Sequence, residues 1–119
     1  MNVTMLKAKL HMARVTQADL DYEGSLAIDQ DLLDAVGILP YEKIMVANVE
    51  NGERLETYAI SAERGSRTIC LNGAAAHKGK CGDRIIVFAF ASMSEDEARN
   101  HHPRVLILDA ENQTLQSRG

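Results

Sequence analysis

The sequence predicts a small, mainly β domain that closes into a compact barrel and carries two short helices. Three observations favour this fold class. About six short apolar runs rich in Val and Ile are separated by tight turns. The chain has 119 residues, enough for one domain with one core. Aromatic residues make up only 4% of it, so that core must be aliphatic. Closure into a barrel would also remove the exposed edges of so small a sheet.

The predicted strands follow one another along the chain. The run TMLKAKLHMARVT, residues 4–16, alternates in part, with Met5, Leu10 and Val15 among polar residues. The runs at 43–49 and 54–61 flank Asn51-Gly52, and an Asn-Gly pair between two β-rich runs predicts a hairpin. Further apolar strands are expected at residues 67–73, 83–91 and 104–109.

Two helices are expected between the strands. Asp29 is placed to cap a helix over residues 30–36, and Gly37 is placed to end it. Ser94 and Glu97 form a capping-box pattern ahead of a second helix over residues 95–100. Neither helix is long, so the sheet dominates the predicted fold.

Composition and charge exclude several classes of function. The formal net charge is −4, which argues against binding a nucleic-acid backbone. No apolar stretch approaches the length of a signal peptide or a membrane span, so we expect a cytoplasmic protein without membrane contact. Cys70 and Cys81 lack metal-ligand spacing and are expected to be thiols. His101 and His102 are adjacent and would not face one ligand on a strand, so no metal site is expected.

The pair Gly24-Ser25 is ordinarily a turn. It also permits a rarer chemistry, in which the Ser25 hydroxyl attacks the carbonyl of Gly24 and the chain is finally cleaved. Glycine favours that attack because a residue without Cβ accepts a strained backbone and leaves its carbonyl open. Gly65-Ser66 is a second such pair, so the dipeptide alone does not choose between the two serines.

Other polar residues are candidates by their spacing. Lys9 and His11 would share one face of a strand. Arg54 and Tyr58 would do the same, with Cα atoms about 13 Å apart, while Thr57 would point the other way. A solvated strand face is the better explanation of the Lys9 and His11 pair, and a half-exposed strand is the ordinary explanation of the Arg54 and Tyr58 pair. The segment NGAAAH, residues 72–77, predicts a tight turn whose small side chains would let a ligand approach the backbone.

Five separated segments together resemble the bacterial aspartate 1-decarboxylases. They are TMLKAKLH (4–11), ADLDYEGSLAID (18–29), NGERLETYAI (51–60), AERGSR (62–67) and NGAAAH (72–77). The resemblance runs from Met5 to about Asp109 and implies a double-psi β-barrel that assembles as a homotetramer with active sites between subunits. It implies self-cleavage between Gly24 and Ser25, which gives a β chain of residues 1–24 and an α chain of residues 25–119.

The resemblance also implies the chemistry. Ser25 would become a covalent pyruvoyl group, with neither metal nor pyridoxal phosphate, and this group would form a Schiff base with L-aspartate. Loss of CO2 would give β-alanine for pantothenate synthesis, and some members need a maturation factor for the cleavage. Tyr58 matches the proton donor, and tyrosines are protonated near neutral pH. The remaining matches are Thr57, Gly73, Ala74 and Ala75 for substrate binding, Lys9 and Arg54 for the substrate carboxylates, and Gly24, Tyr22, His11 and Asn72 for lining the site or for processing.

Two alternatives remain open at this point. The chain could be a binding module for a small acid or a protein partner that never cleaves itself. It could also be an enzyme in which His11 or His77 activates Ser25 as an ordinary nucleophile. Both alternatives predict an intact chain of 13.1 kDa, whereas only the decarboxylase interpretation requires the break.

Overall fold

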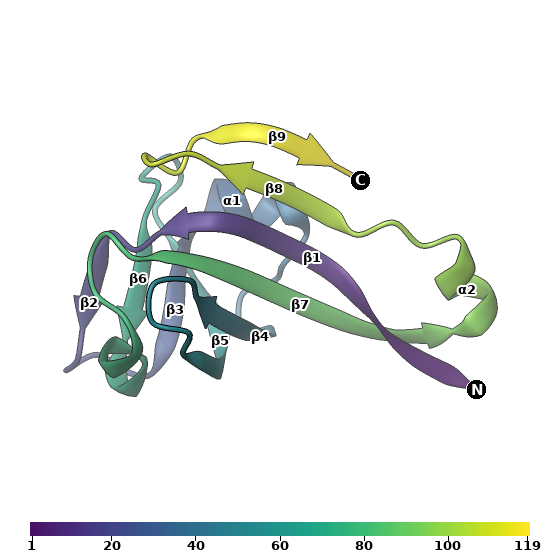
Figure 1. Ribbon diagram of the computed structural model, residues 1–119, viewed down its shortest axis with the longest axis horizontal. Coiled ribbons are helices and arrows are strands. Elements are labelled where there is room, and N and C mark those ends of the chain that lie inside the picture. Colours follow the sequence, from purple (N-terminus) through teal and green to yellow (C-terminus); the bar gives the residue numbers. More distant parts are fainter.

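One mixed sheet of nine strands forms most of the protein in a computed structural model that describes residues 1–119 (Figure 1). In chain order the elements are β1 (Asn2–Arg14), β2 (Gln17–Asp19), β3 (Ser25–Asp29), α1 (Gln30–Val36), β4 (Lys43–Asn48), β5 (Arg54–Ala62), β6 (Ile69–Asn72), the 3₁₀ helix η1 (Gly73–Lys78), β7 (Arg84–Ser94), α2 (Glu95–Arg99), β8 (Arg104–Leu108) and β9 (Thr114–Arg118). The mainly β fold with short helices is therefore confirmed.

The sheet order β2-β6-β3-β5-β4-β7-β1-β8-β9 brings together strands that are distant in the sequence. Three neighbouring pairs are parallel, namely β1 with β8, β2 with β6 and β3 with β5. The sheet curls into a barrel-like body whose interior is aliphatic, and α1 adds Leu32, Leu33 and Val36 to that core. β3 lies inside this body between β5 and β6, which places Ser25 at the start of a central strand.

Each predicted strand and helix is present. The Asn51-Gly52 hairpin joins β4 to β5, and Gly52 has the positive φ of 74° that such a turn requires. Asp29 caps α1 by accepting a hydrogen bond from the backbone N–H of Asp31, and Gly37 ends the helix in the left-handed conformation. The capping box of Ser94 and Glu97 begins α2 as expected.

Four elements were not predicted, namely β2, β3, β9 and η1. All five residues of β3 are buried and all five of β9 are exposed, so neither strand has the alternation that marks a half-buried strand. The segment after Asn72 was expected to be a turn and instead forms a short 3₁₀ helix. These differences matter most at β3, because it carries Ser25.

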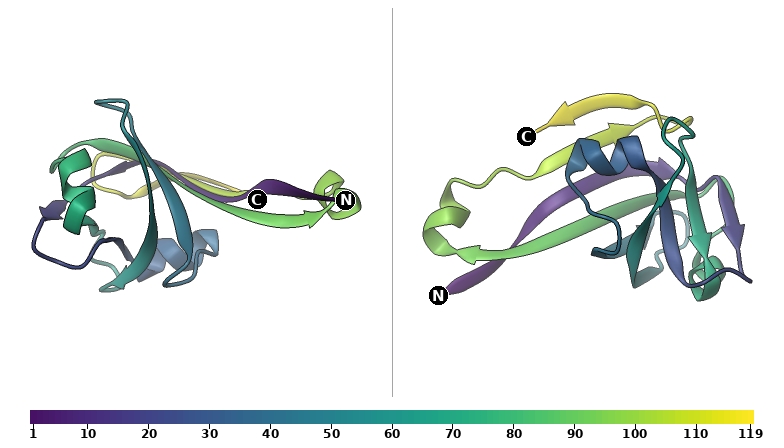
Figure 2. Two further views of the ribbon diagram at one scale, coloured as in Figure 1. Left: turned by 90° about the horizontal axis from the view of Figure 1, so that it is seen from below. Right: turned by 180° about the vertical axis from the view of Figure 1, so that it is seen from behind.

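A long ribbon projects from the barrel-like body (Figure 2). The first half of β1 pairs with the last half of β7, from Asn2 opposite Ser94 to Leu6 opposite Phe90, and α2 lies at its tip. Phe90 on this ribbon is 46% exposed, although phenylalanine is usually buried. No helix in the structure is both long and apolar enough to cross a membrane.

Candidate active site

Ser25 is buried at the first position of β3, directly opposite Asn72 on β6. Its hydroxyl donates a hydrogen bond to the backbone oxygen of Glu23 at 3.2 Å. The same oxygen accepts a hydrogen bond from Nδ2 of Asn72, also at 3.2 Å. Ser25 is therefore not a turn residue. Its hydroxyl is held from two sides, next to the peptide bond that joins it to Gly24.

The other Gly-Ser pair has a different environment. Gly65 has a φ of 79°, and Ser66 is exposed in the turn before β6. The Ser66 hydroxyl bonds only within that turn, to the backbone oxygen of Glu63 and from the N–H of Thr68. The structure thus separates the two serines, which the Gly-Ser dipeptide alone did not, and of the two only Ser25 is buried.

The side chain of Asn72 has a second partner. Its Oδ1 accepts a hydrogen bond from the thiol of Cys70 at 3.1 Å. Burial, followed by the nearby charge of Asp19, raises the pKa of Cys70, so the sulfur carries its proton near neutral pH. Cys70 was predicted only to be a thiol. Its position two residues before Asn72 was the available signal, because such residues share one face of a strand.

Gly73 packs against the backbone of Gly24. Gly73 has a φ of 64°, and a Cβ built on it would lie 2.7 Å from both the nitrogen and the Cα of Gly24 and 2.8 Å from the oxygen of Tyr22. By contrast, a Cβ on Gly24 would meet nothing within 4 Å, and Gly24 has no positive φ. Gly24 therefore shows no left-handed backbone strain, and the steric requirement for glycine lies at Gly73.

Two hollows lie beside the Gly24-Ser25 pair. The first, of about 300 Å³, is lined by Tyr22, Glu23, Ser25, Pro40, Tyr41, Tyr58, Ile60 and Ser61. The rings of Tyr41 and Tyr58 are 6.4 Å apart within it. No lysine or arginine lines this hollow. It brings together the serine, the predicted proton donor and Tyr22, but it offers no cation to an acidic ligand.

The second hollow, of about 310 Å³, is lined by Gly24, Leu55, Glu56, Thr57, Ala74, Ala75 and Lys78. Thr57 and Tyr58 are neighbours on β5, so they point to opposite faces of the strand and serve different hollows. Thr57, Ala74 and Ala75 are thereby brought to Gly24. The only cation here is Lys78, whose ammonium is 2.9 Å from a carboxylate oxygen of Glu53.

Lys9 and Arg54 line neither hollow. They lie at the two ends of a row of side chains that crosses four strands on one face of the sheet. Arg54 contacts the sulfur of Met45 at 3.8 Å, Met45 lies opposite Phe88, and the ammonium of Lys9 is 5.6 Å from the centre of the Phe88 ring. The two cations predicted to bind substrate are therefore separate from Ser25 within one chain.

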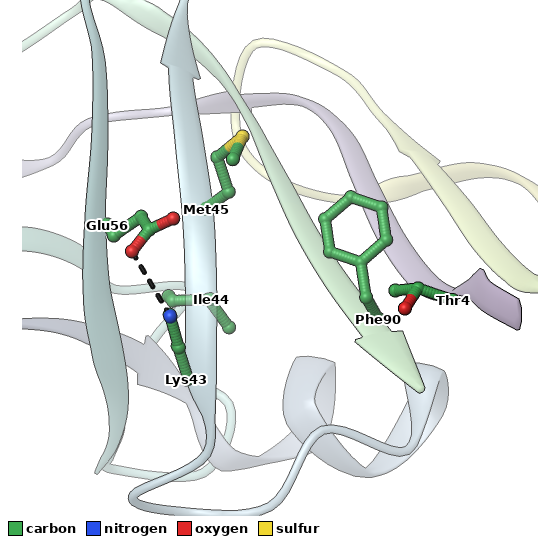
Figure 3. Close-up of a pocket in the computed structure, with 6 residues that line it drawn as sticks. All are labelled: Thr4, Lys43, Ile44, Met45, Glu56 and Phe90. Atoms are coloured by element: carbon green, nitrogen blue, oxygen red, sulfur yellow. Dashed lines mark ion pairs between the residues drawn. The ribbon is translucent and has the colours of Figure 1, made fainter. Parts of the chain in front are cut away.

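The same face of the sheet is hollowed between β4, β5 and the projecting ribbon (Figure 3). Thr4, Lys43, Ile44, Met45, Glu56 and Phe90 line a space of about 270 Å³. Lys43 and Glu56 form an exposed ion pair across neighbouring strands, with Phe90 and Thr4 on the far side. This hollow contains none of the predicted site residues.

Neither histidine considered as a base for Ser25 bonds to it. Burial, with the positive charges of Lys9 and Arg118, lowers the pKa of His11, so its ring is neutral near pH 7. Its Nδ1 atom is buried without a hydrogen-bond partner. His77 lines a separate polar hollow with Glu50, Asn51, Gly79, Lys80 and Asp83. Both cysteines are free thiols, and no cluster of three or more metal-ligating side chains is present.

Comparison with known proteins gives matches over nearly the whole chain. The family described as "Aspartate decarboxylase" matches residues 1–115. An aspartate 1-decarboxylase of Halorhodospira halophila is 60% identical over 119 residues, which is 100% of this chain and 94% of that protein. The enzyme of the same name from Salinibacter ruber is 57% identical over 118 residues, 99% of this chain and 81% of the relative. That from Pseudomonas aeruginosa is 59% identical over 113 residues, 95% and 90% of the two chains.

Proposed function

This chain belongs to the aspartate decarboxylase family, and on that premise we propose that it decarboxylates L-aspartate to β-alanine and CO2 with a pyruvoyl group made from its own Ser25. It is accordingly a carboxy-lyase that supplies β-alanine for pantothenate synthesis. The observation that carries the pyruvoyl assignment is the environment of Ser25, a buried hydroxyl held by Asn72 and Glu23 between two hollows.

Self-cleavage would convert Ser25 in three steps. Its Oγ attacks the carbonyl carbon of Gly24, and collapse of the adduct breaks the Gly24–Ser25 amide and leaves an ester. Loss of the proton on the Ser25 Cα then breaks the Cβ–Oγ bond, so Gly24 departs as a carboxylate. The new N-terminal dehydroalanine takes up water and releases ammonia to give the pyruvoyl group. Asn72 donates a hydrogen bond to Oγ, the atom that becomes part of the departing carboxylate. This donor stabilises the negative charge that develops on that oxygen.

The residues around Ser25 fit a bound pyruvoyl group. When formed, that group supplies the electron sink into which the substrate's α-carboxylate releases its electrons as CO2. Tyr58 shares the hollow of Ser25 and is the proposed donor of the proton that replaces the carboxylate. Thr57, with the backbone of Gly73, Ala74 and Ala75, is proposed to bind the substrate on the Gly24 side. Tyr22, in the loop before β3, also lines the Ser25 hollow.

The substrate carboxylates need cations near Ser25, and a single chain does not place any unpaired lysine or arginine in the hollows there. The Ser25 hollow has no lysine or arginine, and the lysine beside Gly24 is paired with Glu53. Lys9 and Arg54 line neither hollow, and they flank Met45 and Phe88 near the projecting ribbon that leaves Phe90 exposed. We therefore propose a homotetramer with sites between subunits, in which Lys9 and Arg54, with His11 nearby on β1, complete the site of a neighbouring copy. Arginine suits this role because its guanidinium binds a carboxylate through two hydrogen bonds.

The intact mass of the purified chain after a warm incubation tests the cleavage. We expect the 13.1 kDa chain to be replaced by two fragments that separate between Gly24 and Ser25, the larger carrying pyruvoyl in place of serine. The Ser25→Ala chain should stay whole. If the wild-type chain stays whole, the incubation is repeated in a cell extract that can supply a maturation factor. A chain that also remains whole there would contradict the proposed chemistry.

Mixed assemblies test the origin of Arg54. We expect Arg54→Ala to cleave normally but to have a raised KM for aspartate, and Ser25→Ala to be inactive. The two variants are unfolded together in equal amounts and refolded into mixed assemblies. We expect roughly a quarter of wild-type activity, because with random mixing one site in four joins an intact Ser25 to a neighbour's intact Arg54. The same mixture made from Ser25→Ala and the double variant should stay inactive, because neither chain then carries Ser25. Activity no higher than that of the separate variants would place Arg54 in the site of its own chain.

A further inference from the structure

We propose that Cys70 is a positioning residue for the conversion of Ser25, because its thiol fixes the orientation of the Asn72 carboxamide. This inference rests on the proposed self-cleavage and concerns the rate of that step. Cys70 and Asn72 lie on β6, and Ser25 lies opposite them on β3. All three side chains are buried, so water does not compete for their hydrogen bonds.

The hydrogen bonds among these residues run in one direction. The Cys70 thiol donates to Oδ1 of Asn72 at 3.1 Å, Nδ2 of Asn72 donates to Oγ of Ser25 at 3.2 Å, and the Ser25 hydroxyl donates to the backbone oxygen of Glu23 at 3.2 Å. Each donor along this path meets an acceptor. The path therefore starts at a group that must carry a proton, and the raised pKa of Cys70 keeps the thiol protonated near neutral pH.

A carboxamide has two orientations of nearly the same shape, which exchange its oxygen and its nitrogen. In the opposite orientation Oδ1 of Asn72 would face Oγ of Ser25. The serine proton would then be drawn to Asn72 and away from Glu23. The thiol of Cys70 opposes this exchange because it is a donor and needs an acceptor opposite it. Cys70 lies on the side of Asn72 away from Ser25, and its thiol favours the orientation in which the carboxamide oxygen faces Cys70 and the nitrogen faces Ser25.

The orientation of Asn72 matters for the bond that breaks last. Elimination places negative charge on the carboxylate that contains the former Oγ of Ser25. An N–H aimed at this oxygen stabilises that charge, whereas the carbonyl oxygen of a reversed Asn72 would repel it. Loss of the thiol proton should therefore slow cleavage without removing any atom that reacts. The residue acts through Asn72, the group to which its thiol donates.

Three variants at position 70 separate donation of a hydrogen bond from packing. Cys70→Ser keeps a donor, whereas Cys70→Val and Cys70→Ala remove it, with valine filling the space and alanine leaving a cavity. The readout is the first-order rate of cleavage of a chain freshly made by cell-free translation, followed by intact mass. Thermal unfolding of each uncleaved variant is measured in the Ser25→Ala background. Cys81→Ala is the matched control, because it removes an exposed thiol that bonds only to the backbone oxygen of Thr16.

We expect Cys70→Ser and Cys81→Ala to cleave within about twofold of wild type, and Cys70→Val and Cys70→Ala to cleave roughly five- to tenfold more slowly, the effect of one lost orienting hydrogen bond. Valine should be at least as stable as serine at this buried position, so the rates would not follow stability. Equal rates of cleavage for all variants, or rates that follow thermal stability, would overturn the role of Cys70 and leave the proposed function standing. A wild-type chain that stays whole even in a cell extract would overturn the proposed function and this inference with it.

Discussion

Replacing Gly73 by alanine is expected to leave the chain uncleaved and without decarboxylase activity. The new Cβ would lie 2.7 Å from the nitrogen and Cα of Gly24 and 2.8 Å from the oxygen of Tyr22, closer than real Cβ contacts. These are backbone atoms, so no side-chain rotation relieves the clash. The segment that carries the proposed cleavage site must move, and a displacement of about 1 Å at a reacting group costs on the order of a hundredfold in rate.

A matched control isolates this clash from backbone strain. Gly52 also has a positive φ, 74° against 64° at Gly73, but a Cβ there would meet nothing within 4 Å. Gly52→Ala therefore carries the cost of a left-handed alanine, about 1 kcal/mol, without the contact. We expect it to cleave at nearly the wild-type rate. The two variants are compared by intact mass over time, and equal rates of cleavage would show that the contact with Gly24 is unimportant.

Replacing Asp29 by asparagine is expected to destabilise the protein by about 2–4 kcal/mol at neutral pH. The carboxylate is fully buried at the end of β3, four residues after Ser25. Its Oδ1 accepts from the backbone N–H groups of Asp31 at 2.8 Å and Gly65 at 3.0 Å, and its Oδ2 accepts from that of Arg67 at 2.8 Å. Asparagine keeps only one oxygen, so its NH2 group would oppose at least one of these three donors.

The contribution of Asp29 should also depend on pH. Burial alone would raise the pKa of this carboxyl, but the three backbone N–H donors and the charge of Arg67 outweigh it and lower the pKa below the ordinary value. The unfolded chain therefore takes up a proton at a higher pH than the folded one. The stabilisation is complete above about pH 4 and is lost as the pH falls through the lowered pKa of the folded state.

Urea unfolding at pH 7 and at successively lower pH checks both statements. The Ser25→Ala background keeps the chain whole, and equal protein concentrations keep the concentration dependence of assembly the same for both proteins. We expect the difference between wild type and Asp29→Asn to shrink on acidification. Asp31→Asn makes the same change at an exposed carboxylate that pairs with Arg64, and it should have a much smaller effect. A difference that stays constant with pH would mean that the Asp29 charge contributes nothing.

Local patterns in the sequence were sufficient for most of the fold. Strands with a buried and an exposed face show alternation, the Asn51-Gly52 turn marks its hairpin, and Asp29 and Ser94 mark the starts of helices. These signals act over a few residues, and the structure retains each of them. β3 and β9 lack such a signal, since one is buried on both faces and the other is exposed throughout.

The candidate site was predicted only in part from the residues themselves. Spacing offered Lys9 with His11 and Arg54 with Tyr58, but solvated or half-exposed strand faces were the ordinary explanation of these pairs. The matches of Asn72, Gly73 and the alanines came from the resemblance to a family. The structure then joined Ser25 to Asn72 and Gly24 to Gly73, and it left Lys9 and Arg54 outside the two hollows beside Gly24 and Ser25.

The sequence by itself determined a β-rich chain with its turns and caps, and its matching segments pointed to aspartate decarboxylation. Only the tertiary structure decided that Ser25 and not Ser66 is buried in a polar site, that Gly73 and not Gly24 must lack a side chain, and that Cys70 bonds to Asn72. The physical reason is distance along the chain. Ser25 and Asn72 are 47 residues apart, and their hydrogen bond depends on the packing of β3 against β6. No pattern over a few residues encodes that contact.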